Sequence, residues 1–210
     1  MTKAIFWDND GVLVDTERLY FKATFEVLAT VGITLTKAQY VELFMVQSTG
    51  PWHLAADAGL DAHDIERLRS ERDATYCRWL TETPVVMPGI PQVLDALRGK
   101  YVLGIVTSAY QDHFDLIHQR SGLLPYFDFV LTGADYTNVK PHPEPYLTAI
   151  ERSGVDAADC LAIEDSVRGL RSAKAAGIRC AVLPNTLTGS CAFDDADFML
   201  SSVSDVLRLL

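Results

Sequence analysis

The chain has 210 residues, of which 49% are hydrophobic and 22% are charged, and its formal net charge at pH 7 is −10. These proportions are those of an ordinary globular protein, and the length allows one domain or a core domain with an insertion. The acidic balance argues against binding to nucleic acid or to an anionic membrane surface. It does not argue against a phosphorylated substrate, because a local site can be positive on an acidic protein.

The amino terminus and the cysteines indicate a reduced, cytoplasmic setting. Met1-Thr2-Lys3 leads into an apolar run without the features of a signal peptide, and no apolar span is long enough to cross a membrane. The four cysteines form no C-x-x-C pair, and none stands at zinc-ligand spacing to a histidine. Cys160 and Cys180 lie in apolar runs and are expected to be buried thiols.

The first element is a short apolar run, Ala4-Ile5-Phe6-Trp7, and the residues Asp8-Asn9-Asp10-Gly11 follow it at once. This pattern predicts a buried strand that delivers two acids at its carboxyl end. Acids at positions i and i+2 of an extended segment point the same way, so they repel unless positive charge lies beside them. The pair therefore indicates a metal-assisted reaction.

Residues 16–82 show almost no strand-like alternation, and their apolar period is helical. Gly32, Gly50 and Gly59 are the expected stops. The helices predicted in this segment are 16–31, 37–45, 51–58 and 64–80.

After Pro84 and Pro88-Gly89, strands and helices alternate. The predicted strands are 101–106, 127–132, 160–163, 179–183 and 197–200. The predicted helices are 112–120, 143–152, 168–176 and 204–209. Continuous apolar runs separated by amphipathic helices are typical of an α/β fold with a parallel sheet covered on both faces. The helical block is then an insertion: residues 1–15 and 84–210 form the core domain, and residues 16–83 form a helical domain.

Polar residues stand at the end of several strand-like runs, where open parallel sheets bind their ligands. The expected group is Asp8, Asp10, Thr107, Ser108, Lys140, Glu164 and Asp165. So many carboxylates suit Mg²⁺, and a lysine and a hydroxyl suit the oxygens of a phosphoryl group. In this arrangement Asp8 would attack phosphorus and Asp10 would carry the proton.

Each of these motifs also has an ordinary structural interpretation. Asp-x-Asp-Gly can be a turn, and Glu164-Asp165-Ser166 can cap a helix. Lys140-Pro141 can be a solvated loop, and Thr107-Ser108 a strand exit. All four ordinary interpretations would have to be true at once, at the ends of successive apolar runs. A shared site is the simpler explanation.

At these residues the chain resembles the haloacid dehalogenase superfamily of phosphotransferases that use an aspartate nucleophile. The similarity runs over nearly the full length and rests on four motifs in order. They are Asp8-x-Asp10-Gly11-Val12-x-x-Asp15-Thr16-Glu17, Thr107-Ser108, Lys140-Pro141-x-Pro143 and Glu164-Asp165-Ser166-x-x-Gly169. Within the superfamily the chain looks most like the branch of phosphoglycolate phosphatases, sugar-phosphate phosphatases and β-phosphoglucomutase.

The resemblance implies a Rossmann-like core with a helical cap inserted after the first motif. It implies Asp8 as nucleophile and Asp10 as general acid and base. It places Mg²⁺ on Asp8, the backbone carbonyl of Asp10 and Asp165, with Glu164 in support. It implies that Lys140 and one hydroxyl bind the phosphoryl group. The spacing to Tyr126-Phe127-Asp128 favours Thr107 over Ser108 as that hydroxyl. Relatives that cleave carbon–halogen or carbon–phosphorus bonds lack an acid at the position of Asp10, so those reactions are not expected.

Two departures from the family pattern matter. β-Phosphoglucomutase carries His, Lys and Arg where this chain has Tyr20, Met45 and Thr49, which removes the main support for a mutase. Asn9 is polar where relatives usually carry an apolar residue.

Substrate selection in this branch usually comes from the cap. The candidates are Tyr20, Gln47, Thr49, Trp52 and His53, although aromatic residues at helical spacing are more often packing residues and a histidine such as His53 is more often a surface residue.

The sequence thus predicts a Mg²⁺-dependent phosphatase that hydrolyses a small phosphorylated metabolite, a sugar or polyol phosphate, through an aspartyl-phosphate. The alternatives are a phosphomutase on the same core and a non-catalytic protein that binds a phosphorylated ligand. We expect no nucleic-acid or membrane partner, and a monomer or weak homo-oligomer.

Overall fold

The computed structural model describes residues 1–210 and divides into two compact units. The first unit joins Met1–Asp15 to Val85–Leu210, and the second is Thr16–Pro84. None of the helices combines the length and the apolar character needed to cross a membrane.

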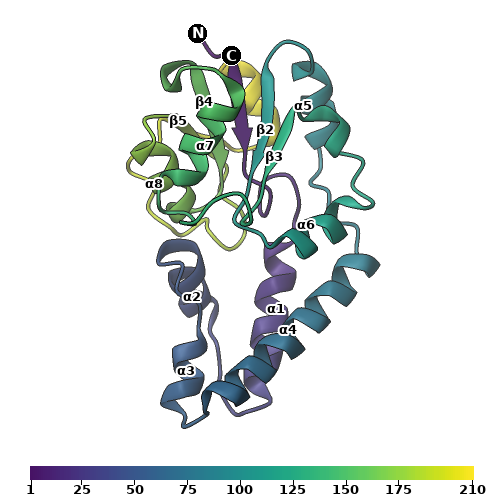
Figure 1. The fold of residues 1–210 in the computed structure, drawn as a ribbon, viewed down its shortest axis with the longest axis vertical. Coiled ribbons are helices and arrows are strands. Elements are labelled where there is room, and N and C mark those ends of the chain that lie inside the picture. Colours follow the sequence, from purple (N-terminus) through teal and green to yellow (C-terminus); the bar gives the residue numbers. More distant parts are fainter. The chain divides into compact units, whose positions relative to one another are not determined.

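The first unit is built on a six-stranded parallel sheet in the order β3-β2-β1-β4-β5-β6 (Figure 1). The strands are β1 Ala4–Trp7, β2 Val102–Val106, β3 Phe129–Leu131, β4 Cys160–Glu164, β5 Arg179–Val182 and β6 Phe198–Met199. All residues of β1 and β4 are buried, so side chains on both faces of these strands are covered. The predicted α/β fold with a parallel sheet is confirmed.

The helices of this unit follow its strands in alternation. They are α5 Ile90–Leu97, α6 Gln111–His118, α7 Glu144–Ser153 and α8 Val167–Ala175. Four 3₁₀ or π segments of the chain complete the list: Leu124–Tyr126, Ala157–Asp159 and Val203–Arg208 here, and Val41–Val46 in the second unit. α7 packs on β2 and β3, and α8 packs on β4 and β5 (Figure 1).

Prediction and structure differ most at three elements of the core. Helix α5 is missing from the prediction, although its apolar residues Ile90, Val93, Leu94 and Leu97 are spaced as one helical face and are all buried. The predicted helix 204–209 is the 3₁₀ helix Val203–Arg208. The predicted strand 197–200 is only the two residues of β6.

The second unit is helical. Its helices are α1 Glu17–Ala29, α2 Lys37–Tyr40, α3 Trp52–Asp57 and α4 Ala62–Glu82, and α1 packs along α4. Asp61 caps α4 by accepting a hydrogen bond of 2.9 Å from the backbone N–H of Asp64. The predicted helix 37–45 is α2 continued by a π-helical segment, in which the N–H of Gln47 donates to the carbonyl of Glu42, five residues back.

Candidate active site

The carboxyl end of β1 places Asp8 in the middle of the sheet edge. The backbone N–H of Asp8 donates to the carbonyl of Ile163 on β4 at 2.9 Å, which continues the β1–β4 ladder by one residue. The Asp8 side chain is 12% exposed, so its carboxylate lies beyond the strand with little contact with water. A buried carboxylate is costly unless positive charge or donors lie beside it.

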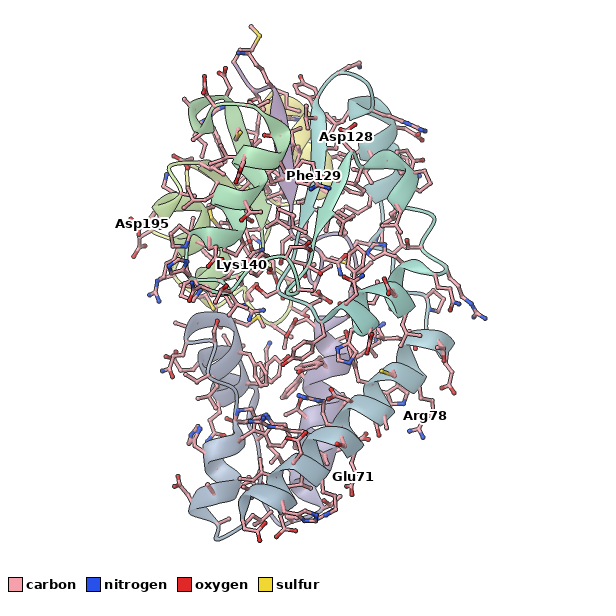
Figure 2. All side chains as sticks on the ribbon, viewed as in Figure 1. Glu71, Arg78, Asp128, Phe129, Lys140 and Asp195 are labelled. Atoms are coloured by element: carbon pink, nitrogen blue, oxygen red, sulfur yellow. The ribbon has the colours of Figure 1, made fainter.

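Lys140 supplies that charge. Its ammonium donates to Asp8 Oδ1 at 2.8 Å, to Glu164 Oε1 at 2.6 Å and to the carbonyl of Val106, the last residue of β2, at 2.8 Å. Lys140 precedes α7 and lies beyond the carboxyl ends of the strands (Figure 2). Burial lowers the pKa of Lys140, but the carboxylates of Asp8 and Glu164 outweigh it and hold the pKa above its usual value. Lys140 therefore stays a cation and joins three strand ends.

Glu164 is fully buried and held on several sides. Its Oε1 also accepts a hydrogen bond of 2.6 Å from the hydroxyl of Tyr146, the third residue of α7. Burial raises the pKa of Glu164, and the nearby Asp8 carboxylate raises it further. A Cβ placed on Gly169 would lie 1.9 Å from Glu164 Oε2, so only glycine leaves room for this carboxylate. Glu164 thus links the lysine to α7 and α8.

Asp165 is the second acid after β4 and is held from a different direction. The side-chain amide of Asn185, three residues beyond the last residue of β5, donates to Asp165 Oδ2 at 2.6 Å. Gly11 in the turn after β1 has φ +85°, and a Cβ there would lie 2.1 Å from Asp165 Oδ2. The two glycines of the sequence motifs therefore make room for the two acids after β4.

Asp10 and Thr107 form the other side of the site. Asp10 Oδ2 accepts hydrogen bonds from the Thr107 hydroxyl at 3.4 Å and from the Asn9 side-chain amide at 3.2 Å. Thr107 follows β2 directly and is 1% exposed. The hydroxyl of Tyr136 donates to the backbone carbonyl of Thr107, which fixes the start of this loop. Ser108 is next to Thr107 and half-buried, and its hydroxyl oxygen is shielded from water.

The acids fit a hard divalent cation. Oxygens of Asp8, Glu164 and Asp165 all lie within 4.8 Å of one another, and all three residues are buried. Carboxylate oxygens are the donors that Mg²⁺ prefers. Both oxygens of Glu164 accept hydrogen bonds, Oε1 from Lys140 and Tyr146 and Oε2 from Ser166 at 3.4 Å, so Asp8 and Asp165 are the better direct ligands of the three.

The capping interpretation of the motif after β4 holds for one residue only. Ser166 caps α8, because its hydroxyl accepts a hydrogen bond of 3.1 Å from the N–H of Gly169. The preceding acids Glu164 and Asp165 face Lys140 and Asn185 instead.

Within the second unit, two of the five cap candidates share one neighbour. The guanidinium of Arg72 lies 4.4 Å from the ring centroid of Tyr20 and 5.4 Å from that of Trp52, and Arg72 is 4% exposed. The other three, Gln47, Thr49 and His53, are exposed. Gln47 donates to Glu42 at 2.7 Å.

Sequence reasoning missed Tyr146, Asn185, Tyr136 and Arg72. Asn185 could have been predicted from the sequence. It is a polar residue shortly after the predicted strand 179–183, and polar residues after strand-like runs were expected to face the site. The others reach their partners through side-chain packing that no sequence spacing encodes. Both buried thiols, Cys160 and Cys180, were predicted correctly.

The model of the haloacid dehalogenase-like hydrolase family matches residues 5–183. The chain belongs to this family.

Individual relatives agree along nearly the whole chain. YhcW of Bacillus subtilis is 31% identical over 211 residues, which cover 98% of this chain and 94% of that protein. The Phosphorylated carbohydrates phosphatase of Thermotoga maritima is 31% identical over 182 residues, which cover 84% and 82%. Among solved structures, CbbY of Rhodobacter sphaeroides in complex with phosphate has a TM-score of 0.79 at 27% identity, covering 96% of this chain and 95% of that one. The predicted superfamily and the predicted enzyme class, a phosphatase, are confirmed.

Proposed function

We propose that the protein is a Mg²⁺-dependent phosphatase for a sugar or polyol phosphate and that it works through an aspartyl-phosphate on Asp8. The observation that carries this proposal is the Asp8 carboxylate at the end of the central strand, bonded to Lys140 at 2.8 Å, with Asp10 two residues further on. A nucleophile, a cation and a second acid at one sheet edge are what in-line phosphoryl transfer requires.

In the first step, an Asp8 oxygen attacks phosphorus while the bond from phosphorus to the leaving oxygen breaks. Asp10 gives its proton to that oxygen, and the alcohol departs. In the second step, water attacks the phosphorus of the Asp8 phosphate, and Asp10 takes its proton back from that water. The bond between Asp8 and phosphorus breaks, and inorganic phosphate leaves with both residues restored.

Lys140 and the hydroxyl after β2 serve the phosphoryl oxygens. The Lys140 ammonium stands between Asp8 and Glu164 and offsets the charge of an arriving phosphate. We assign the hydroxyl to Thr107, whose side chain also touches Asp10, with Ser108 as its neighbour in the loop.

The residues that would hold Mg²⁺ are Asp8, Asp165 and the backbone carbonyl of Asp10, with Glu164 in support. A bound ion would supply positive charge that offsets the negative charge of the nucleophile and of the substrate. Without it, the carboxylates around Asp8 outnumber the single ammonium of Lys140, and a phosphate dianion would be repelled.

The substrate class is supported by the relatives. One is named Phosphorylated carbohydrates phosphatase and another, from Escherichia coli, Hexitol phosphatase B. A structure of CbbY holds xylulose-1,5-bisphosphate. On this proposal, residues 16–83 act as the cap that selects the substrate, through side chains among Tyr20, Gln47, Thr49, Trp52 and His53.

The test is phosphate release by the purified full chain from a panel of hexose, hexitol and glycerol phosphates, phosphoglycolate, pyrophosphate and nucleotides. We expect release to be fastest for sugar or polyol phosphates, to stop with a chelator and to return with Mg²⁺. Release from none of these compounds would contradict the proposal. A substrate that isomerises without releasing phosphate would make the protein a mutase, and binding without turnover would make it a ligand-binding protein.

A further inference from the structure

A buried line of hydrogen bonds runs from the end of α6 to Asp10. The Ser121 hydroxyl lies 2.8 Å from His118 Nδ1, His118 Nε2 lies 2.9 Å from Asn9 Oδ1, and Asn9 Nδ2 lies 3.2 Å from Asp10 Oδ2. Asn9 is fully buried, and His118 is 6% exposed.

Asp10, at one end of this line, determines which atom donates and which accepts in each of its hydrogen bonds. Asp10 Oδ2 accepts, which leaves Oδ1 as the oxygen that carries the transferable proton, so Asn9 donates through its amide and uses its oxygen to accept. His118 must then donate from Nε2 to that oxygen, which leaves Nδ1 to accept from Ser121. Burial lowers the pKa of His118 to about 4, so the ring is neutral at pH 7, as this pattern requires.

The line ends on one oxygen of Asp10. Asn9 and Thr107 both donate to Oδ2, and because the single hydroxyl proton of Thr107 would turn to a bound phosphoryl group, Asn9 is the donor that holds the rotation of the carboxylate about its last side-chain bond. An apolar residue at position 9 would remove one of these donors. A proton donor must present its carboxyl in one orientation to the leaving oxygen, because efficiency depends on hydrogen-bond geometry.

We propose that Asn9, held by His118, is a positioning residue that orients Asp10 for proton transfer to the leaving group. This inference rests on the proposed function, since it assigns Asn9 and His118 to the same site. It adds two residues to the reaction that the family motifs do not include.

The experiment uses the leaving group to separate positioning from packing. An alkyl phosphate needs a proton on its leaving oxygen, whereas p-nitrophenolate departs from p-nitrophenyl phosphate without one. The value of kcat/KM reports the steps up to formation of the aspartyl-phosphate, which is the step that Asp10 assists as an acid. The two substrates are p-nitrophenyl phosphate and the best alkyl phosphate of the panel.

We expect Asn9→Leu to lower kcat/KM for the alkyl phosphate by at least about tenfold and for p-nitrophenyl phosphate by less than about threefold. His118→Phe should give the same unequal loss, and His118→Gln, which can still donate to Asn9, should restore part of it. In an Asp10→Asn background, Asn9→Leu should have no further selective effect.

Ile117→Ala is the matched control, because Ile117 is a buried apolar residue of the same helix. It should lower stability without changing the ratio of the two kcat/KM values. If Asn9→Leu does not fold, the pair His118→Phe and His118→Gln gives the same comparison. Equal losses for the two substrates in these variants would overturn the positioning role. If the wild-type protein releases phosphate from neither substrate, the proposed function fails instead.

Discussion

Four carboxylates and one ammonium define the candidate site at the scale of single residues. Carboxylate oxygens of Asp8, Glu164 and Asp165 lie close enough together to bind one metal ion. Lys140 forms ion pairs with Asp8 and Glu164. The two acids after β4 have different neighbours: Tyr146 donates to Glu164, and Asn185 donates to Asp165. Such separate support holds acids with the same chemistry in different orientations, so that they can take different roles.

Asp8→Asn should abolish turnover and leave the fold intact. An amide cannot act as the nucleophile, so phosphate release should fall by a factor of roughly 10³ or more. The fold should persist because Lys140 keeps its bond of 2.6 Å to Glu164. Phosphate release and thermal melting of the variant check both statements. Asp195→Asn removes the same charge from an exposed position and should retain full activity. Appreciable turnover by Asp8→Asn would remove Asp8 from the nucleophile role.

Mg²⁺ should raise the melting temperature of the wild-type protein and not that of Asp165→Asn. A ligand at about 100 times its Kd stabilises the protein to which it binds by about 2.7 kcal/mol. A second group in the other unit, the exposed Asp61 and His63 with the half-buried Asp64, could also bind metal. Asp64→Asn is therefore the matched control and should keep the wild-type response. If Asp165→Asn responded to Mg²⁺ as strongly as the wild type, the metal would have to bind elsewhere.

At the scale of elements, the strands were easier to predict than the helices. The runs that became β1 and β4 are continuous and apolar because both faces of these strands are covered, and such runs stand out in a sequence. Helix α5 was not predicted because Pro84 and Pro88-Gly89 were interpreted as a boundary, and the proline that follows them, Pro91, was not considered as a helix start. Proline in the first turn is in fact a helix-start signal, as it is here. Five of the six residues in Val41–Val46 are apolar, a composition that does not separate an α turn from a π turn.

Gly169→Ala in helix α8 should destabilise the protein and lower its activity. Replacing glycine by alanine inside a helix usually stabilises it by about 1 kcal/mol. At Gly169 the new Cβ would lie 1.9 Å from Glu164 Oε2, so the sign should reverse, with a loss of about 1–3 kcal/mol. Urea unfolding of Gly169→Ala measures this, and phosphate release should fall with it because Glu164 must move away from Lys140. Arg171→Ala, at an exposed position of the same helix, should change neither quantity. A Gly169→Ala protein more stable than the wild type would contradict the packing described here.

At the scale of the whole molecule, topology explains why so much of the site could be predicted. In a parallel sheet all carboxyl ends lie at one edge, so residues that follow separate runs, such as Asp8, Thr107 and Asp165, were expected to converge. Knowing the strands was enough for these. Tyr146 and His118 lie on helices, and their contacts depend on how each helix rotates against the sheet, which the sequence pattern does not specify. The roles of these residues stay predictions, but the placement of β1, β2 and β4 side by side is observed.

The buried histidine makes the stability of the whole molecule depend on pH. Burial lowers the pKa of His118 to about 4, against 6.5 as its ordinary value, although the nearby Asp115 opposes the shift. Between these values the unfolded chain binds a proton that the folded chain does not, so stability falls as the pH falls. The contribution is fully present above pH 6.5, is lost progressively down to pH 4, and amounts to about 3 kcal/mol.

Urea unfolding at pH 7, 6, 5 and 4 measures the slope of the unfolding free energy against pH. His118→Phe keeps an apolar ring against Phe114, whose centroid lies 4.3 Å from that of His118, and should flatten this part of the curve. The comparison isolates the histidine because every other titrating group is the same in both proteins. Identical slopes in the two proteins would mean that His118 titrates normally and is more open to water than its 6% exposure indicates.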